Sequence, residues 1–168
     1  MTTGELFADA FGRVREAVCD VVDGLSADQL AWRADAQANS IAWLVWHLTR
    51  IQDDHVAAVA GVDQAWTASG WAPRFALPFD VADTGYGHAS TEIAAVVADA
   101  EALRGYHEAV YENTLRFVGG LVEGDLDRIV DERWDPPVTM GVRLVSVITD
   151  DLQHAGQAAF VRGLLERR

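Results

Sequence analysis

Residues 141–166 form the stretch GVRLVSVITDDLQHAGQAAFVRGLLE. It is too long for one strand and lacks the period-two alternation of a half-buried strand, so we predict a helix. The helix is apolar on nearly every side, which predicts that protein surrounds it and that it is the core helix. Asp150 and His154 interrupt the apolar pattern, and both are costly to bury unless something pairs with them.

Three more long segments have the apolar spacing of amphipathic helices, and each lies between a capping residue and glycine. We predict helices from Glu5 to Leu25, from Asn39 or Ser40 to about Gly61, and from Ser90 or Thr91 through Phe117. Thr3 is the predicted cap of the first helix, and Ser26 opens a short helical turn with Gln29 at the capping-box position. Four long helices predict an all-α fold, a four-helix bundle whose inward side chains can build a site.

Two long connections link these helices. Residues 62–89 are punctuated by glycine and proline and are rich in tryptophan and phenylalanine, and residues 123–140 centre on Trp134-Asp135-Pro136-Pro137. Connections of this length are uncommon in compact domains unless they do something, such as covering a binding site. We therefore predict a partly packed loop over residues 62–89 that can lie over a site.

The composition predicts one soluble, cytoplasmic domain over residues 1–168. Half of the residues are hydrophobic, as in an ordinary globular domain. The net charge of −13 argues against binding to DNA, RNA or an anionic membrane through a broad basic surface, so a small-molecule partner fits better. No signal peptide and no apolar segment of membrane-spanning length is recognisable.

Cys19 is the only cysteine of the chain. An intramolecular disulfide and a cysteine-rich metal site are therefore excluded. Thiol chemistry would need a thiol from outside, unless Cys19 itself were reactive.

His47, Asp150 and His154 are the candidate metal ligands. Asp150 and His154 are four residues apart, so their side chains leave one helix face about 5 to 6 Å apart, a separation that one metal ion can bridge. His47, within Trp46-His47-Leu48 on another predicted helix, can supply a third ligand. Two imidazoles and one carboxylate leave an open coordination position, as expected of a catalytic zinc site, and nickel or iron accept the same donors.

Plainer interpretations stay open from the residues alone. His47 can be a core histidine with ordinary hydrogen bonds, and Asp150 and His154 can be an internal pair on one helix face. Asp151 points about 100° away from Asp150 and can orient a ligand instead. Asp54 is an alternate ligand, although a surface carboxylate near Arg50 explains it equally well.

Arg74 is the candidate catalytic residue outside the metal triad. A cation in an aromatic loop that can close over the site could receive a carboxylate of a substrate. Gly156 costs helix stability, which predicts a packing reason, such as the close approach of a neighbouring helix. His88 and His107 have no partners at suggestive spacing, and we expect His107 to be exposed.

The chain resembles the DinB-like superfamily of metal-binding four-helix bundles and, within it, the actinobacterial mycothiol-transferase-like proteins related to the N-terminal domain of maleylpyruvate isomerase. The motifs that carry the resemblance are Trp46-His47-Leu48, residues 70–75, 84–88 and 134–139, and Asp150 to Gln157. The resemblance implies that His47, Asp150 and His154 hold the metal. Asp150 departs from the family pattern, which has His or Glu at that position.

The resemblance also implies a metal-dependent transferase that conjugates a low-molecular-weight thiol such as mycothiol to a small electrophile. The implied cofactor is a divalent metal ion, zinc ahead of nickel or iron, and Arg74 would position an acidic group of the thiol or substrate. A non-catalytic metal- or ligand-binding stress-response bundle and a metal-assisted hydrolase stay open as alternatives. A homodimer through the exposed parts of the long helices also stays open. Fold and site transfer from a family more safely than substrate does.

Overall fold

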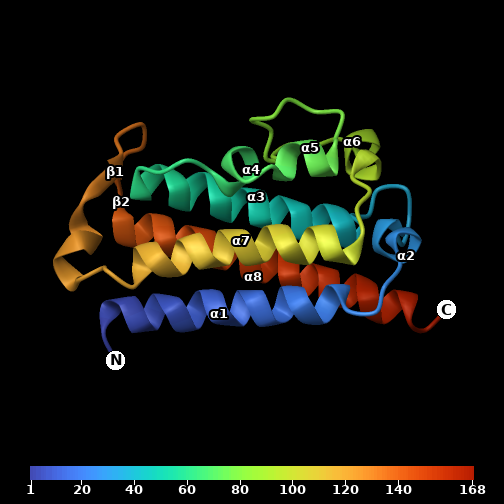
Figure 1. Ribbon diagram of the computed structural model, residues 1–168, viewed down its shortest axis with the longest axis horizontal. Coiled ribbons are helices and arrows are strands. Elements are labelled where there is room, and N and C mark those ends of the chain that lie inside the picture. Colours follow the sequence, from blue (N-terminus) through green and yellow to red (C-terminus); the bar gives the residue numbers. More distant parts are fainter.

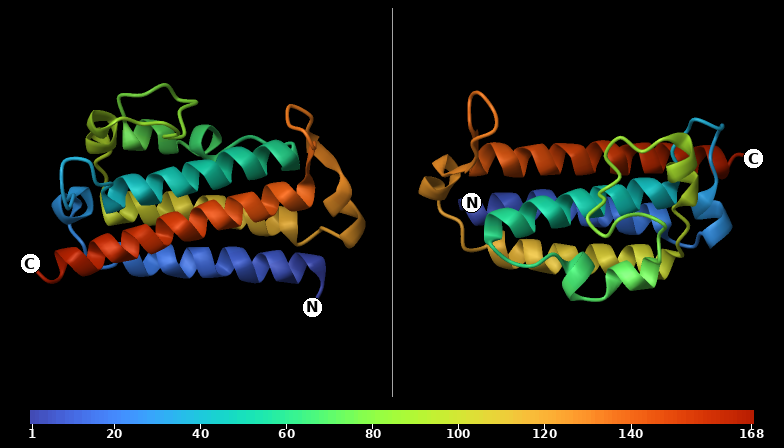
Figure 2. Two further views of the ribbon diagram at one scale, coloured as in Figure 1. Left: turned by 180° about the vertical axis from the view of Figure 1, so that it is seen from behind. Right: turned by 90° about the horizontal axis from the view of Figure 1, so that it is seen from above.

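Four long helices lie side by side in the computed structural model, which describes residues 1–168 (Figures 1 and 2). They are α1 (Thr3–Val22), α3 (Ile41–Ala60), α7 (Ala100–Val118) and α8 (Met140–Leu165). Helices α3 and α1 each pack against both α7 and α8, so every long helix has two long neighbours. The all-α class predicted from the sequence is confirmed.

The helix ends follow local capping chemistry. Ser40 caps α3 by accepting a hydrogen bond from the backbone N–H of Trp43, and Gly61 ends the helix with a positive φ of 71°. Ser26 and Gln29 form the predicted capping box of α2 (Ala27–Ala31). The cap of α1 is Thr2 rather than the predicted Thr3, because the Thr2 side chain accepts from the Glu5 backbone while the Glu5 carboxylate reaches back.

The third predicted helix is divided into two. A short helix, α6 (Ser90–Ala95), ends where Val96 takes an extended conformation, and α7 starts after Asp99. The Asp99 side chain accepts a hydrogen bond from the Ala102 backbone, so it caps α7. The prediction of one continuous helix was wrong because Asp99 favours a helix start over a helix interior.

The two connections contain short elements. Residues 62–89 include α4 (Ala65–Ala68) and α5 (Trp71–Phe75), and they cover part of α3 (Figure 2, right). Residues 123–140 include a 3₁₀ turn, η1 (Glu123–Asp127), and an antiparallel pair of strands, β1 (Ile129–Asp131) and β2 (Val138–Thr139). These strands are too short to give a pattern in the sequence.

The most buried helix is α3, not α8. Fourteen of its 20 residues are buried, against seven of the 26 in α8. The prediction that residues 141–166 form the core helix was therefore wrong. The reason is that residues 62–89 cover α3, whereas α8 exposes four large apolar side chains, Val142, Val145, Leu152 and Phe160.

A buried polar layer divides the core into two apolar clusters. Along α8, Asp151 lies between Val147 of one cluster and Ala155 of the other. The layer is made by fully buried polar side chains of three helices, which are Thr49, Gln52, His107, Thr114 and Asp151. His107 was expected to be exposed, and it is buried because α7 turns it toward Thr49 of α3.

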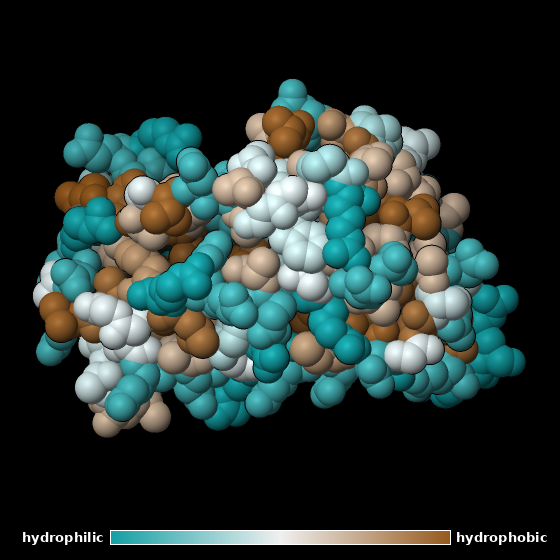
Figure 3. Space-filling model, viewed as in Figure 1, coloured by the Kyte–Doolittle hydropathy of each residue, from teal (hydrophilic) through white to brown (hydrophobic).

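The outer surface is mixed in character. On the face drawn in Figure 3, hydrophobic side chains form small patches between hydrophilic ones. None of the helices combines the length and the apolar character that crossing a bilayer requires.

Candidate metal centre

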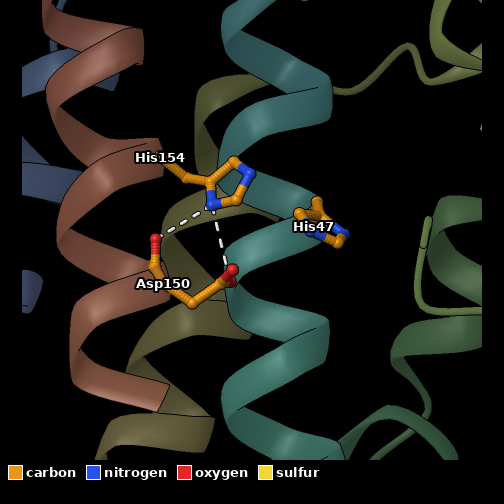
Figure 4. Close-up of side chains that lie close together, drawn as sticks. All are labelled: His47, Asp150 and His154. Atoms are coloured by element: carbon orange, nitrogen blue, oxygen red, sulfur yellow. Dashed lines mark hydrogen bonds and ion pairs between the residues drawn. The ribbon is translucent and has the colours of Figure 1, made fainter. Parts of the chain in front are cut away.

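The structure brings His47, Asp150 and His154 together on the seam between α3 and α8 (Figure 4). One potential ligand atom from each residue lies within 4.8 Å of the others. His47 comes from α3 and is buried, while Asp150 and His154 come from successive turns of α8 and are partly exposed. Solvent therefore reaches part of the Asp150 and His154 side chains.

His47 is held in one tautomer by the segment that covers α3. Its Nδ1 lies 2.6 Å from the carbonyl oxygen of Thr84, and because a carbonyl only accepts, Nδ1 carries the proton and donates it. The Nε2 atom therefore keeps its lone pair. The ring also stacks on Trp43, with centroids 4.7 Å apart and planes 11° apart, and burial lowers the pKa of His47, which keeps the ring neutral.

The close approach of Thr84 depends on Gly85. Its φ of 89° is in the region that favours glycine, and a Cβ at this position would lie 2.9 Å from His47 Nδ1 and 2.8 Å from the Trp46 ring. The Asp83 carboxylate accepts from the Gly85 backbone N–H and lies 3.1 Å from His88 Nε2. The turn that carries Thr84 is therefore fixed by its own hydrogen bonds.

His154 is oriented by its own helix. Its Nδ1 lies 2.9 Å from the backbone carbonyl of Asp150, which places the proton on Nδ1 and leaves the Nε2 lone pair free (Figure 4). Burial alone would lower the pKa of His154, but the negative charge of the Asp150 carboxylate beside the ring and the hydrogen bond to the Asp150 carbonyl outweigh it and raise the pKa. For Asp150, burial alone would raise the pKa, but His154, with His47 and His55 adding to its effect, reverses this and lowers it.

The three side chains fit a divalent metal ion. Two imidazoles each present an Nε2 lone pair while Nδ1–H donates to a backbone carbonyl, which is the usual outer-shell arrangement for histidine ligands. Asp150 Oδ2 is buried and has no hydrogen-bond partner, being 3.4 Å from His154 Nδ1. An unpartnered carboxylate oxygen beside two imidazole nitrogens is a donor set that suits zinc, nickel or iron.

The other predicted residues lie outside this group. Arg74 on α5 is 2.8 Å from Glu101 and lies over the Trp71 ring, 5.1 Å from its centroid, so its role stays a prediction. Asp54 accepts from Gln64 rather than pointing into the triad.

Two further residues of α8 differ from what the sequence led us to expect. Asp151 is fully buried, makes no hydrogen bond to a triad residue, and has a pKa raised well above the ordinary value by burial and by Asp150. Gly156 is exposed, and a Cβ at this position would have no neighbouring atom within 4 Å, so the expected close approach of a helix was wrong.

Sequence reasoning missed the residues that support His47. Trp43 Nε1 donates to His88 Nδ1 at 3.1 Å, and the His88 ring stacks on Trp46 with centroids 5.8 Å apart. His88 therefore has partners, contrary to our expectation. The Thr84-Gly85-Tyr86-Gly87-His88 turn stands out in the sequence, but the spacing of its residues does not reveal which helix the turn contacts.

Comparisons with known proteins agree with this architecture. A family model described as Mycothiol-S-transferase matches residues 6–167. A solved structure from Enterococcus faecalis, described as the conserved protein of a locus, superposes with a TM-score of 0.92 at 29% identity and covers 100% of this chain and 99% of its own. No curated protein matches the chain at a significant level.

Proposed function

The chain belongs to the mycothiol-S-transferase family, and we propose that it is a metal-dependent transferase joining a low-molecular-weight thiol to a small electrophile. The observation that carries the proposal is the triad of His47, Asp150 and His154, with two free Nε2 atoms and one unpartnered carboxylate oxygen. We also propose that the four packed helices are one DinB-like four-helix-bundle domain over residues 1–168, with the triad as its metal site.

The triad residues would hold the ion through His47 Nε2, His154 Nε2 and a carboxylate oxygen of Asp150. When bound, a divalent ion such as zinc favours a thiolate over a thiol at neutral pH and leaves a position for it to occupy. Thr84 and Trp43 fix the His47 ring, and the Asp150 carbonyl fixes the His154 ring. These contacts preorganise the donors, because the rings need not turn to bind.

The transfer itself is a nucleophilic substitution or addition. The thiol, mycothiol or a close analogue, loses its proton to solvent, and the sulfur gives its electron pair to the electrophilic carbon to form a C–S bond. A leaving group departs with its bonding pair, or an activated alkene takes up a proton instead. Arg74 would position an acidic group of the thiol or the electrophile, which requires it to exchange its contact with Glu101.

The test begins with the metal. Protein purified without added metal is loaded with zinc, nickel or iron, dialysed, and assayed for bound metal and for conjugation of mycothiol to a bimane reagent. We expect His154→Ala to weaken metal binding by more than about 100-fold, since even outer-shell partners are worth up to that much. Asp54→Asn is the matched control for metal binding, and it should keep the metal.

The outcomes separate the alternatives. A protein that keeps metal but never conjugates the thiol is a binding protein, and the transferase proposal fails. Ester or amide hydrolysis that the thiol inhibits would instead indicate a metal-assisted hydrolase. Wild-type protein that retains no metal under any loading condition would contradict the metal site itself.

A further inference from the structure

A polar cavity lies on the same α3/α8 seam as the triad. It has a volume of about 330 Å³ and lies between the last turns of α3, the first turn of α8 and the β1–β2 hairpin. Three arginines line it, which are Arg128, Arg133 and Arg143. The chain has only 13 basic residues against 26 acidic ones, so three guanidinium groups in one cavity are a local concentration of positive charge.

Ion pairs inside the cavity leave a surplus of positive charge. Arg143 lies 2.9 Å from Asp131, and Arg133 binds the same carboxylate through Nε and Nη2. Asp54, the second lining carboxylate, accepts from Gln64. Three guanidinium groups therefore face two carboxylates, which leaves one net positive charge.

Several of the guanidinium donors have no protein acceptor. Arg128 uses only Nη2, which donates to the Val59 carbonyl at 3.0 Å, and Arg133 keeps Nη1 free on a side chain that is 86% exposed. Free donors on two guanidinium groups that line one cavity match the two oxygens of a carboxylate. The cavity thus has both the charge and the hydrogen-bonding groups to take up a carboxylate.

The cavity and the triad lie along the same two helices, α3 and α8. His55 follows His47 by eight residues on α3, and Arg143 precedes Asp150 by seven on α8, with His55 Nδ1 3.5 Å from Arg143. At 1.5 Å per residue, these offsets place the two sites about 10 to 12 Å apart along the seam. Burial and Arg143 lower the pKa of His55, and Asp150 is near enough to oppose them.

We propose that this arginine cavity binds the carboxylate of the electrophile, so that the preferred substrates carry an anionic group about 10 Å from the reactive carbon. The proposal rests on the proposed transferase function, since it names the substrate class of that reaction. A chain with a net charge of −13 repels anionic substrates in general. A cationic cavity at a fixed distance from the triad overcomes that repulsion only for substrates whose anionic group lies at the matching distance from the reactive carbon.

The test compares two electrophiles that differ only in charge. Iodoacetyl-glycyl-glycine spans about 10 Å from its reactive methylene to its carboxylate, at 3.3 to 3.6 Å per residue, and its C-terminal amide is neutral. In both, the thiolate displaces iodide, which leaves with the C–I bonding pair as the C–S bond forms. We expect the wild type to prefer the acid by about tenfold in kcat/KM, which corresponds to 1.4 kcal/mol.

Variants locate the preference. The double variant Arg128→Gln and Arg133→Gln should bring the acid-to-amide ratio close to one. Arg13→Gln removes an exposed arginine of α1 that pairs with Asp9, so it controls for general charge. Arg74→Gln tests the rival arginine on α5. A wild-type acid-to-amide ratio of one would overturn the proposal. So would a fall of this ratio in Arg13→Gln or Arg74→Gln as large as the fall in the double variant.

Binding of an unreactive analogue separates this proposal from the proposed function. Acetyl-glycyl-glycine and its amide are titrated into metal-free protein, and backbone NMR shifts are followed. We expect the acid alone to shift the signals of residues 128–133, and only when Arg128 and Arg133 are present. If iodoacetamide is never turned over, the transferase proposal fails, whereas absence of acid binding refutes the arginine cavity in either case.

Discussion

His107 gives the sharpest stability prediction, because it is a fully buried histidine without a charged partner. Thr49 donates its hydroxyl to the Val45 carbonyl, so His107 Nδ1 carries the proton and donates to Thr49 at 3.1 Å. The Nε2 atom is buried with no partner. Burial lowers the pKa of His107 to about 4, with Arg15 adding to the effect. The perturbation is His107→Gln, whose amide can still donate to Thr49 but does not titrate.

The magnitude follows from proton linkage. Above pH 6.5 the imidazole is neutral in both the folded and the unfolded chain, so it adds no pH dependence. As the pH falls from 6.5 toward 4, the unfolded chain binds a proton that the folded chain does not, and folding loses about 1.36 kcal/mol per pH unit. Between pH 7.5 and pH 4.5 this loss amounts to about 2.5 kcal/mol.

Urea unfolding of metal-free wild type and His107→Gln at the two pH values is the assay. The raised pKa of Asp151 acts in the opposite direction, since the folded chain binds that proton more tightly than the unfolded chain does, so total stability alone is not diagnostic. The difference between wild type and variant removes that contribution. We expect the variant to gain about 2.5 kcal/mol relative to wild type on acidification. A difference that does not change with pH would refute the burial argument.

Three further predictions test the site turn, the loop anchor and the first cap. Gly85→Ala should lower the free energy of unfolding by about 2 to 4 kcal/mol and reduce metal retention, because its Cβ would press on His47 and Trp46. Gly87→Ala has open space at a similar φ and should lower the free energy of unfolding by only about 1 kcal/mol. Asp53→Asn should lower the free energy of unfolding by about 1 to 3 kcal/mol and expose residues 62–89 to proteolysis, because the Asp53 carboxylate accepts hydrogen bonds from the backbone N–H groups of Ala65 and Trp66. The free energy of unfolding of Asp54→Asn should differ from that of the wild type by no more than about 0.5 kcal/mol. Thr2→Ala should cost about 1 kcal/mol and Thr3→Ala much less, as thermal unfolding would show. Equal effects within any pair would contradict the contacts described.

The parts of the fold that could be predicted from the sequence are those that depend on neighbouring residues. The start of α3 at Ser40 and its end at Gly61 follow from capping rules that act within one turn. The break at Asp99 is equally local, but it competes with a continuous apolar pattern, and the pattern misled us. That α3 is more buried than α8 depends on where residues 62–89 pack, and no local rule determines this packing.

The triad shows the same division between local and distant contacts. The spacing of Asp150 and His154 brings them together on any helix, and the structure adds His47 because α3 and α8 pack as neighbours. The arginine cavity could not be predicted, because Arg128 precedes β1, Arg133 lies in the loop between β1 and β2, and Arg143 is on α8, and their approach depends on the hairpin. Similarly, no pattern in the sequence predicts that Arg74 contacts Glu101 and Trp71 rather than the triad.

The segment over residues 62–89 links the stability of the fold to the chemistry of the site. It hides the outer face of α3, and through Thr84 it fixes the proton of His47 on Nδ1. If Thr84 moved away, either nitrogen of His47 could carry the proton, and part of the neutral ring population would present N–H instead of a lone pair to the metal. Docking of this segment and metal binding should therefore stabilise each other. Metal ought to slow hydrogen exchange at residues 83–88, and Gly85→Ala ought to abolish that protection.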